Sequence, residues 1–266
     1  RAVVMFTAIA ETKGQPPTFE TDACNLLCDH WSSTTLDGDL TRRSKNRATL
    51  NTALHQTANA ICKRAFLKHM DTMEEGQEIL VTVGGCGAGK GYGLEKDEAT
   101  GQPRVPVAYN LAQRANAVWD SAGDQNATEN PWILQEARKR GLRVSYVFVH
   151  ADPKVSWADP KRGVVQRATK PENGRMVDAL VFADSYAMGA KNHHAFSEKH
   201  RHDPDVTFMF LKNGNPPEVL NEMPKEALAV DRRELAKFAV DTIKQRTDLP
   251  EHVLSGALAG TEIWKD

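Results

Sequence analysis

The chain has 266 residues, and 40% of them are hydrophobic, which is enough for one large globular domain with an ordinary buried core. Its 34 lysine and arginine residues nearly balance its 35 aspartate and glutamate residues, so a net charge of -1 excludes a general attraction to nucleic acid or to anionic membranes. No apolar run approaches the roughly 20 residues of a membrane-spanning helix, and no signal-peptide pattern opens the chain. We therefore expect neither a membrane nor a nucleic acid as a partner.

The four cysteines are too sparse and irregular for a disulfide framework, which favours a reducing compartment such as the cytoplasm. Cys24 and Cys28 form a single C-x₃-C pair without a second pair, so packing thiols are a better interpretation than a zinc site. Because the chain begins at Arg1 without an initiator methionine, we expect a fragment of a longer protein or a processed one.

The first predicted elements are helical. Between residues 50 and 65, leucine, isoleucine and alanine recur at helical spacing, so residues 1–75 are predicted to form an α-rich segment. Gly76 breaks this pattern, and EILVTV at 78–83 is typical of a fully buried central strand. The predicted division is an N-terminal segment, 1–75, and a main domain, 76–266.

After this strand, strand and helix patterns alternate. Residues 117–119 are a short apolar run, and a helix is predicted from Asn130 as its cap, through Pro131 in its first turn, to Gly141. The remaining predictions are a strand at 142–149, a mostly helical stretch at 170–205, a strand at 206–211 and a closing amphipathic helix at 232–245. This order predicts parallel βαβ units and therefore an α/β fold, with a P-loop NTPase or kinase-like parallel sheet flanked by helices.

A glycine-rich loop, GGCGAGKGYG, follows the strand at 78–83 and matches the first seven positions of the phosphate-loop motif G-x-x-x-x-G-K-[ST]. Glycines let successive backbone N–H groups point at phosphate oxygens, and we expect a following helix to direct its N-terminal dipole at the same anion. The alternative is a glycine-rich turn without a ligand. The predicted residues for binding ATP or GTP are Gly84, Gly85, Gly87, Ala88, Gly89, Lys90, Gly91 and Tyr92.

Phosphoryl transfer also needs a carboxylate near the end of a neighbouring strand, to position Mg²⁺ or to accept the proton of the attacking hydroxyl. Asp120 is the predicted catalytic residue and Mg²⁺ ligand, because it directly follows the apolar run at 117–119. Asp124 is the reserve. A surface turn is the alternative role for both residues.

Further cations are needed to neutralise the transferred phosphoryl group. Arg162, Arg167 and Arg175 follow the strand at 142–149, where a helical lid could bring guanidinium groups over the phosphates. Arg167 and Arg175 are the predicted catalytic arginines, and a solvated basic helix face is the alternative. The histidines in NHHAFSEKHRH match no metal signature, so a solvated polar face is predicted there, with His194 and Glu198 on one side of a helix.

The order of these parts resembles the zeta toxins, which are P-loop kinases of toxin–antitoxin systems and related effectors. The resemblance spans residues 78–245 and rests on GGCGAGKG, on ANAVWDSAGDQ with LQEARKRGLRVSYVFVHADPKVSW, and on the arginines near QRATKPENGR. It implies phosphorylation of a hydroxyl on a nucleotide-like small molecule, such as an aminosugar nucleotide or a dinucleotide, with ATP or GTP as the donor. It also implies Lys90 as the phosphate-binding lysine, Asp120 as the strand-ending acid, and Arg167 and Arg175 as lid arginines.

Two departures from the family's pattern stand in the sequence. Gly91 replaces the serine or threonine that holds Mg²⁺, although the loop also resembles that of adenylate kinases, where a glycine follows the lysine and a threonine comes next instead of Tyr92. The family's strand ending in a catalytic Asp-x-Asp is missing after the loop. A similar D-G-D-L-T-R at 37–42 lies upstream, where we interpret it as a coincidence.

We therefore expect a small-molecule kinase of the zeta toxin type that uses Mg²⁺ and acts as a toxin or effector, in the cytoplasm or delivered into another cell. An antitoxin or chaperone is an expected protein partner by analogy alone. The alternative is a degenerate kinase-like domain that binds a nucleotide or a protein without catalysis.

Overall fold

The computed structural model describes residues 16–19, 59–122, 126–170 and 176–261. Within these residues, six strands form one sheet in the order β1-β3-β2-β4-β5-β6, in which all neighbours are parallel except β5 and β6. The predicted α/β class with a mostly parallel sheet is confirmed. The strands are β1 (Thr18–Phe19), β2 (Glu78–Gly84), β3 (Ala117–Ala122), β4 (Arg143–His150), β5 (Val206–Lys212) and β6 (Glu218–Leu220).

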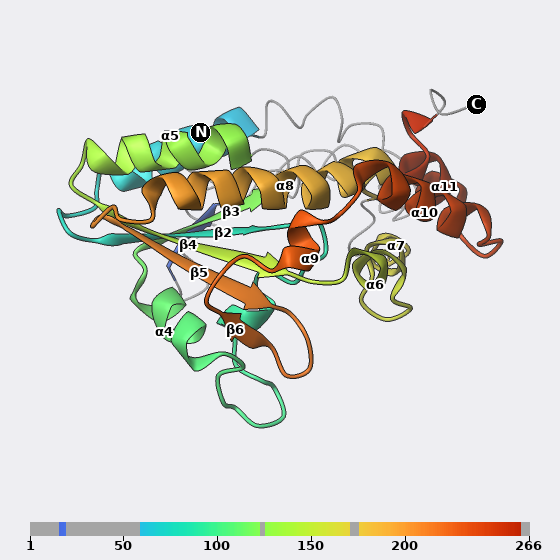
Figure 1. Cartoon of the computed structure of the whole chain (residues 1–266), viewed down its shortest axis with the longest axis horizontal. Coiled ribbons are helices and arrows are strands. Elements are labelled where there is room, and N and C mark those ends of the chain that lie inside the picture. The colour runs from blue at the N-terminus through green and yellow to red at the C-terminus, as the bar shows by residue number, and fades with distance from the viewer. Residues whose placement is uncertain (1–15, 20–58, 123–125, 171–175, 262–266) are drawn as a thin grey trace, which may run out of the picture.

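Helices cover both faces of this sheet, with α5 and α8 on one face and α4 on the other (Figure 1). Short helices α6 and α7 lie with α10 and α11 at the end to which β4 and β5 point (Figure 1). The helices that lie entirely within the described residues are η1 (Tyr92–Leu94), α4 (Pro106–Arg114), α5 (Asn126–Arg138), α6 (Pro153–Ala158), α7 (Val164–Ala168), α8 (Ala179–His200), α9 (Lys225–Leu228), α10 (Arg232–Lys244) and α11 (Glu251–Ala257).

The central strand β2 is buried along its whole length, as its continuous apolar sequence predicts. Ile79, Val81 and Val83 pack in the core beneath α5 and α8, whereas Leu80 packs on the opposite face against α4. Because successive side chains of a strand point to opposite faces, β2 needs apolar residues at every position.

Residues that precede Gly76 belong to the same sheet and core. The strand β1 pairs with β3, and a helix whose described part covers residues 59–70 buries Phe66 against the same layer. The rings of Phe19 and Phe66 lie 5.2 Å apart, and Phe66 and Trp119 lie 4.9 Å apart. The strand at Thr18–Phe19 was not predicted, because two residues carry no readable alternation.

The start of α5 differs from the prediction, because the helix begins at Asn126 instead of being capped by Asn130, and Pro131 lies inside it. Tertiary contacts fix this extra turn. The buried Glu129 carboxylate accepts hydrogen bonds from the Trp119 indole at 3.3 Å and from the Ser121 hydroxyl at 2.8 Å. The proline removes one backbone donor, and these bonds to β3 offset that loss.

The sheet has a topological switch point at β2 and β4. The connection from β2 to β3 passes through α4 on one face, and the connection from β4 to β5 passes through α8 on the other. In open α/β sheets, ligands bind at such a point, outside the carboxyl ends of the strands. The glycine-rich loop directly follows β2, so it lies at this place.

The histidine-rich stretch is only partly the solvated face that we expected. His193 is fully buried on α8, with its ring stacked on Phe148 at 5.4 Å. Asn130 Nδ2 lies 3.2 Å from His193 Nδ1. The sequence could not reveal this, because the packing of α8 along the sheet decides which of its histidines is buried, and the neighbouring His194 is only partly buried.

Candidate functional site

The loop after β2 presents a run of free backbone donors. Gly87 and Gly89 have positive φ angles of 79° and 75°, while the residues between and before them do not. Among the described residues, no acceptor lies within hydrogen-bond reach of the N–H groups of Gly87, Gly89, Lys90 and Gly91. Alternating signs of φ turn successive N–H groups toward one concave side, which is the geometry of a backbone anion site.

Close packing also requires glycine at three positions that follow β2. A Cβ at Gly85 would lie 2.4 Å from the Tyr186 ring, one at Gly87 would lie 2.8 Å from Val164, and one at Gly89 would lie 2.4 Å from the Asn213 amide. Each distance is shorter than a carbon atom tolerates. These glycines are therefore explained both by the fold and by an anion.

Gly91 is different from these three glycines. Its backbone is right-handed helical, with φ of -72° and ψ of -26°, and the nearest atom to a Cβ there would be a Glu95 carboxylate oxygen at 3.4 Å. A side chain fits at this position. The fold therefore does not require the glycine that replaces the motif's hydroxyl.

Two elements far away in the sequence hold the loop in place. On α8, the Ser185 hydroxyl accepts a hydrogen bond from the Cys86 N–H at 3.0 Å. After β5, the Asn213 side chain donates to the Ala88 carbonyl at 2.9 Å, and its backbone N–H donates to the His150 carbonyl. Sequence reasoning missed both residues, and the only signal was for Asn213, whose Asn-Gly pair begins two residues beyond the predicted strand at 206–211.

The helix expected after the loop is not formed. Only the three residues of η1 are helical, and an isolated bridge between Lys96 and Pro103 follows before α4 begins. Two glycines within Gly91–Gly93 and a turn around Gly101 disfavour a continuous helix. The loop therefore lacks a long helix dipole, and an anion there would rely on the N–H groups and on Lys90.

Lys90 and Asp120 come together at this loop, as the sequence predicted. Lys90 Nζ lies 3.6 Å from Asp120 Oδ1, and the side chains are 16% and 28% exposed. The parallel register sets Asp120 beside Thr82, whose hydroxyl donates to the same carboxylate oxygen at 2.5 Å. Asp120 lies within β3, two residues before its end, rather than at the strand edge.

The arginines lie on the segment that contains α6 and α7. Arg167 is exposed and reaches the loop, because a Cβ at Gly87 would lie 3.5 Å from its Nη2. Arg162 and Arg104 approach the Tyr92 ring, at 5.9 Å and 4.2 Å from its centroid. The predicted residues Arg175 and Asp124, and the motif at 37–42, lie outside the described residues.

Aspartates fix the shape of this segment. Asp152 caps α6 by accepting from the N–H groups of Lys154 and Val155, and Asp159 accepts from those of Lys161 and Arg162. The bonds from these backbone groups hold the pKa of Asp159 below its ordinary value. The Asp159 carboxylate is therefore charged at neutral pH, and it fixes the turn at Lys161 and Arg162 that precedes α7.

Two buried titratable groups border the site. Burial lowers the pKa of His150 at the end of β4, and burial raises the pKa of the Tyr186 hydroxyl well above its usual range. Both side chains are consequently neutral at pH 7. They shape the site without contributing charge to it.

The described residues offer little to a metal ion on their own. None of their histidine, cysteine and acidic side chains forms a group that could hold one. Mg²⁺ usually binds through one or two carboxylates together with phosphate oxygens and water. Asp120 could supply the carboxylate, so the site fits Mg²⁺ only when a bound nucleotide supplies the remaining oxygens.

A comparison with protein-family models finds no match for this chain, and a comparison with curated proteins finds none either. The resemblance to zeta toxins therefore stays a prediction. None of the described helices has the length and apolarity that crossing a membrane requires.

Proposed function

We propose that the loop at 84–92 binds the phosphates of ATP or GTP and that the chain transfers the terminal phosphoryl group to a hydroxyl of a nucleotide-like small molecule. The observation that carries this proposal is the run of four free backbone N–H groups beside Lys90, at the topological switch point of the sheet. In a glycine-rich turn with no ligand, these donors would bind water instead.

In this proposal each residue has one role. Lys90 and Arg167 neutralise the charge that develops on the phosphoryl group, and the loop N–H groups hold the donor's phosphates. The acceptor hydroxyl attacks phosphorus, a new P–O bond forms, the bond to the leaving diphosphate breaks, and Asp120 takes the proton. Mg²⁺, when bound, would neutralise the donor phosphates further.

A second candidate function is nucleotide binding without transfer. Two observations favour it: Gly91 offers no hydroxyl to a metal, and η1 replaces the helix that would follow an active loop. In this case the ion pair between Lys90 and Asp120 would serve only to hold the loop until a nucleotide arrives.

Calorimetric titration with ATP and GTP, with and without Mg²⁺, tests the binding that both candidates share. We expect the native chain to bind the nucleotide and Lys90→Ala to lose about 1.5–3 kcal/mol of binding free energy. Lys244→Ala, which changes an exposed lysine on α10, should bind like the native chain. Equal binding by the native chain and Lys90→Ala would reject both candidates.

Asp120→Asn separates the two candidates. Removing this carboxylate should preserve or strengthen nucleotide binding, because it frees Lys90 from its ion pair. If Asp120 is the base, transfer to a pool of nucleotide and nucleotide-sugar acceptors should fall by about 10²–10⁴-fold. Absence of transfer by the native chain to every acceptor would leave the binding function as the conclusion.

A further inference from the structure

In the part of the chain that the structure describes, only half of the outer edge of β5 is paired. The short strand β6 pairs with Phe210, Leu211 and Lys212, and no described strand lies beside Val206–Met209. The Val144 N–H donates to the Asp205 carbonyl, and the Asn213 N–H donates to the His150 carbonyl. These bonds show that the N–H and C=O groups of the odd-numbered residues of β5 point toward β4. By alternation, the N–H and C=O groups of Phe208 point outward, and neither has a partner among the described residues.

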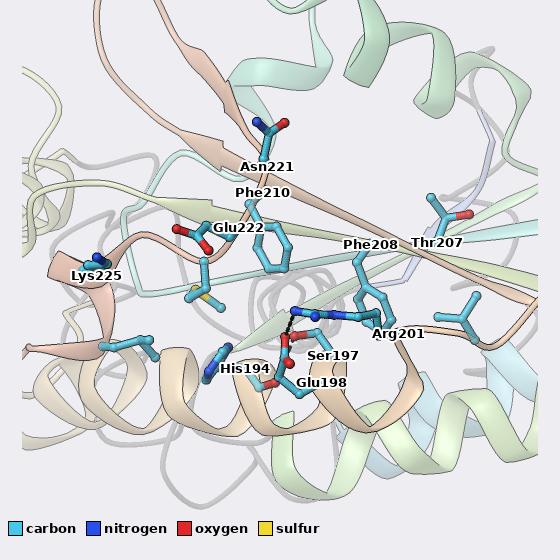
Figure 2. Close-up of a pocket in the computed structure, with 13 residues that line it drawn as sticks. His194, Ser197, Glu198, Arg201, Thr207, Phe208, Phe210, Asn221, Glu222 and Lys225 are labelled. Carbon is cyan, nitrogen blue, oxygen red and sulfur yellow. Dashed lines mark hydrogen bonds and ion pairs between the residues drawn. The ribbon is translucent and has the colours of Figure 1, made fainter.

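A cavity of about 560 Å³ lies directly beside this open edge. Figure 2 shows it between the C-terminal half of α8, the strand β5 and the connection from β6 to α9. Phe208, Phe210, Met223 and Leu228 form its apolar lining. The polar rim includes His194 and Glu198, which share one side of α8 as the sequence predicted.

The path of the chain explains why edge and cavity lie together. In the register of β6, Leu220 lies opposite Phe210, so a longer strand would place Glu222 opposite Phe208. The chain instead bends at Asn221 and Glu222 and continues to α9, which packs against α8. Because of this bend, β6 does not pair with the first half of β5, and Asn221–Met223 line one side of the cavity.

We propose that this edge and cavity bind an extended peptide that adds a strand to the sheet, antiparallel to β5, where β6 ends. Unpaired edge groups provide main-chain hydrogen bonds, and the cavity selects a side chain, which is the usual division of roles in strand addition. A peptide residue opposite Phe208 shares the face of Phe208 and therefore directs its side chain into the cavity.

The charges near the cavity add a second requirement. The peptide residue two positions further along lies opposite Val206, which also lines the cavity. Figure 2 shows Arg201 at the Phe208 end of the cavity, away from Lys225. Arg201 is paired with Glu198, but its side chain is 60% exposed, and a guanidinium has five donors to share. The preferred peptide is therefore a large apolar residue, any residue, and then an acidic residue.

The test uses the full chain and the capped peptide Ac-Thr-Leu-Thr-Glu-Thr-NH₂, followed by amide chemical shifts in ¹⁵N-labelled protein. Binding should shift the amides of Phe208 and of residues that line the cavity. Replacing leucine with alanine should weaken binding by about tenfold, because most of the buried apolar area is lost. Arg201→Glu in the protein should reverse the preference for glutamate over lysine in the peptide.

Two N-methylated peptides form the decisive pair. Methylation of the leucine nitrogen removes the donor that faces the Phe208 carbonyl and should weaken binding by about fivefold or more. Methylation of the next threonine nitrogen, which faces away from β5, should have little effect. Equal affinities, shifts at another surface, or no shifts at millimolar peptide would overturn the proposal.

Sedimentation of the free chain provides the remaining check. A monomer is the expected result. A dimer that excludes the peptide would assign the same edge to a second copy of the chain and would also overturn the proposal.

Discussion

The glycines of the loop look alike in the sequence, but the structure separates Gly91 from Gly85, Gly87 and Gly89. Gly85, Gly87 and Gly89 would each place a Cβ within 3 Å of a neighbour, whereas Gly91 has room for a side chain and an ordinary helical backbone. The fold therefore leaves room at this position for the hydroxyl of the phosphate-loop motif.

Gly91→Ser should restore what the phosphate-loop motif lacks. We expect the variant to fold with a stability within about 1 kcal/mol of the native chain, because its backbone angles suit any residue. Its affinity for ATP should depend more strongly on Mg²⁺, by about five- to tenfold, because the hydroxyl can hold the metal.

The matched control for this experiment is Gly89→Ser. It should lower both stability and binding, since Gly89 has a positive φ and contacts the Asn213 amide. Calorimetry with and without Mg²⁺ measures both variants. An unchanged Mg²⁺ dependence in Gly91→Ser would mean that no metal comes near this position.

His193 makes the stability of the fold depend on pH. Complete burial lowers the pKa of His193 to about 3, whereas an unfolded chain has a histidine pKa of about 6.5. Between these values the unfolded state binds a proton that the folded state does not, so stability is full above about pH 6.5 and falls as the pH falls. The expected loss is about 1.4 kcal/mol per pH unit.

Urea denaturation at pH 7.5 and pH 5 measures this effect. The free energy of unfolding should fall by about 2 kcal/mol more in the native chain than in His193→Gln, which does not titrate. His202→Gln, an exposed residue just beyond α8, should behave like the native chain. If His193→Gln keeps the native pH dependence, the buried ring is not its source.

At the scale of elements, the sequence was informative wherever burial is continuous and uninformative wherever tertiary contacts decide. The strands β2, β4 and β5 and the helices α8 and α10 lie where apolar runs and helical patterns predicted them. Asp178 and Asp231 cap those two helices by accepting from backbone N–H groups. The helix α11 was not predicted, so α10 is not the closing helix.

The failures have a common physical reason. No local sequence pattern predicts that Glu129 accepts a hydrogen bond from Trp119 and lengthens α5, or that Thr18–Phe19 pairs with β3. By contrast, Lys90 and Asp120 could be predicted as neighbours, because parallel strands end at the same edge of a sheet. Ser185 and Asn213 could not, since their contacts with the loop depend on how α8 and β5 pack.

The segment of α6 and α7 provides the prediction for the element scale. Arg167→Ala should lower phosphoryl transfer by about 10²–10³-fold while leaving the fold intact, because this exposed arginine reaches the loop at Gly87. Lys161→Ala, on the same segment, is the control, because only its backbone N–H contacts Asp159. A similar loss of transfer in both variants would indicate a general charge effect rather than a contact with the phosphates.

At the scale of the whole molecule, residues before Gly76 belong to the core. Cys62, Ala65, Phe66 and Met70 are completely buried, and Phe19 contributes a ring to the same cluster. Removing them would expose Trp119 and the adjoining face of the sheet. Truncation to residues 76–266 should therefore cost more than the free energy of unfolding of a typical domain, which is about 5–15 kcal/mol.

Expression of residues 76–266 tests the expected division at residue 75. We expect aggregation, or a broad thermal transition without a sharp midpoint, in comparison with the cooperative unfolding of the full chain. A monomeric fragment that unfolds cooperatively would show that residues 1–75 are a separable appendage.

The pairing of β1 with β3 also has a consequence for synthesis in the cell. Thr18 lies opposite Val118, so the first strand of the sheet to leave the ribosome pairs with a segment about 100 residues later. At about 5–20 residues per second, Phe19 waits about 5–20 s before Trp119, its partner in β3, is synthesised. During that interval its apolar ring is available to chaperones, and the speed of translation through residues 20–118 sets how long that exposure lasts.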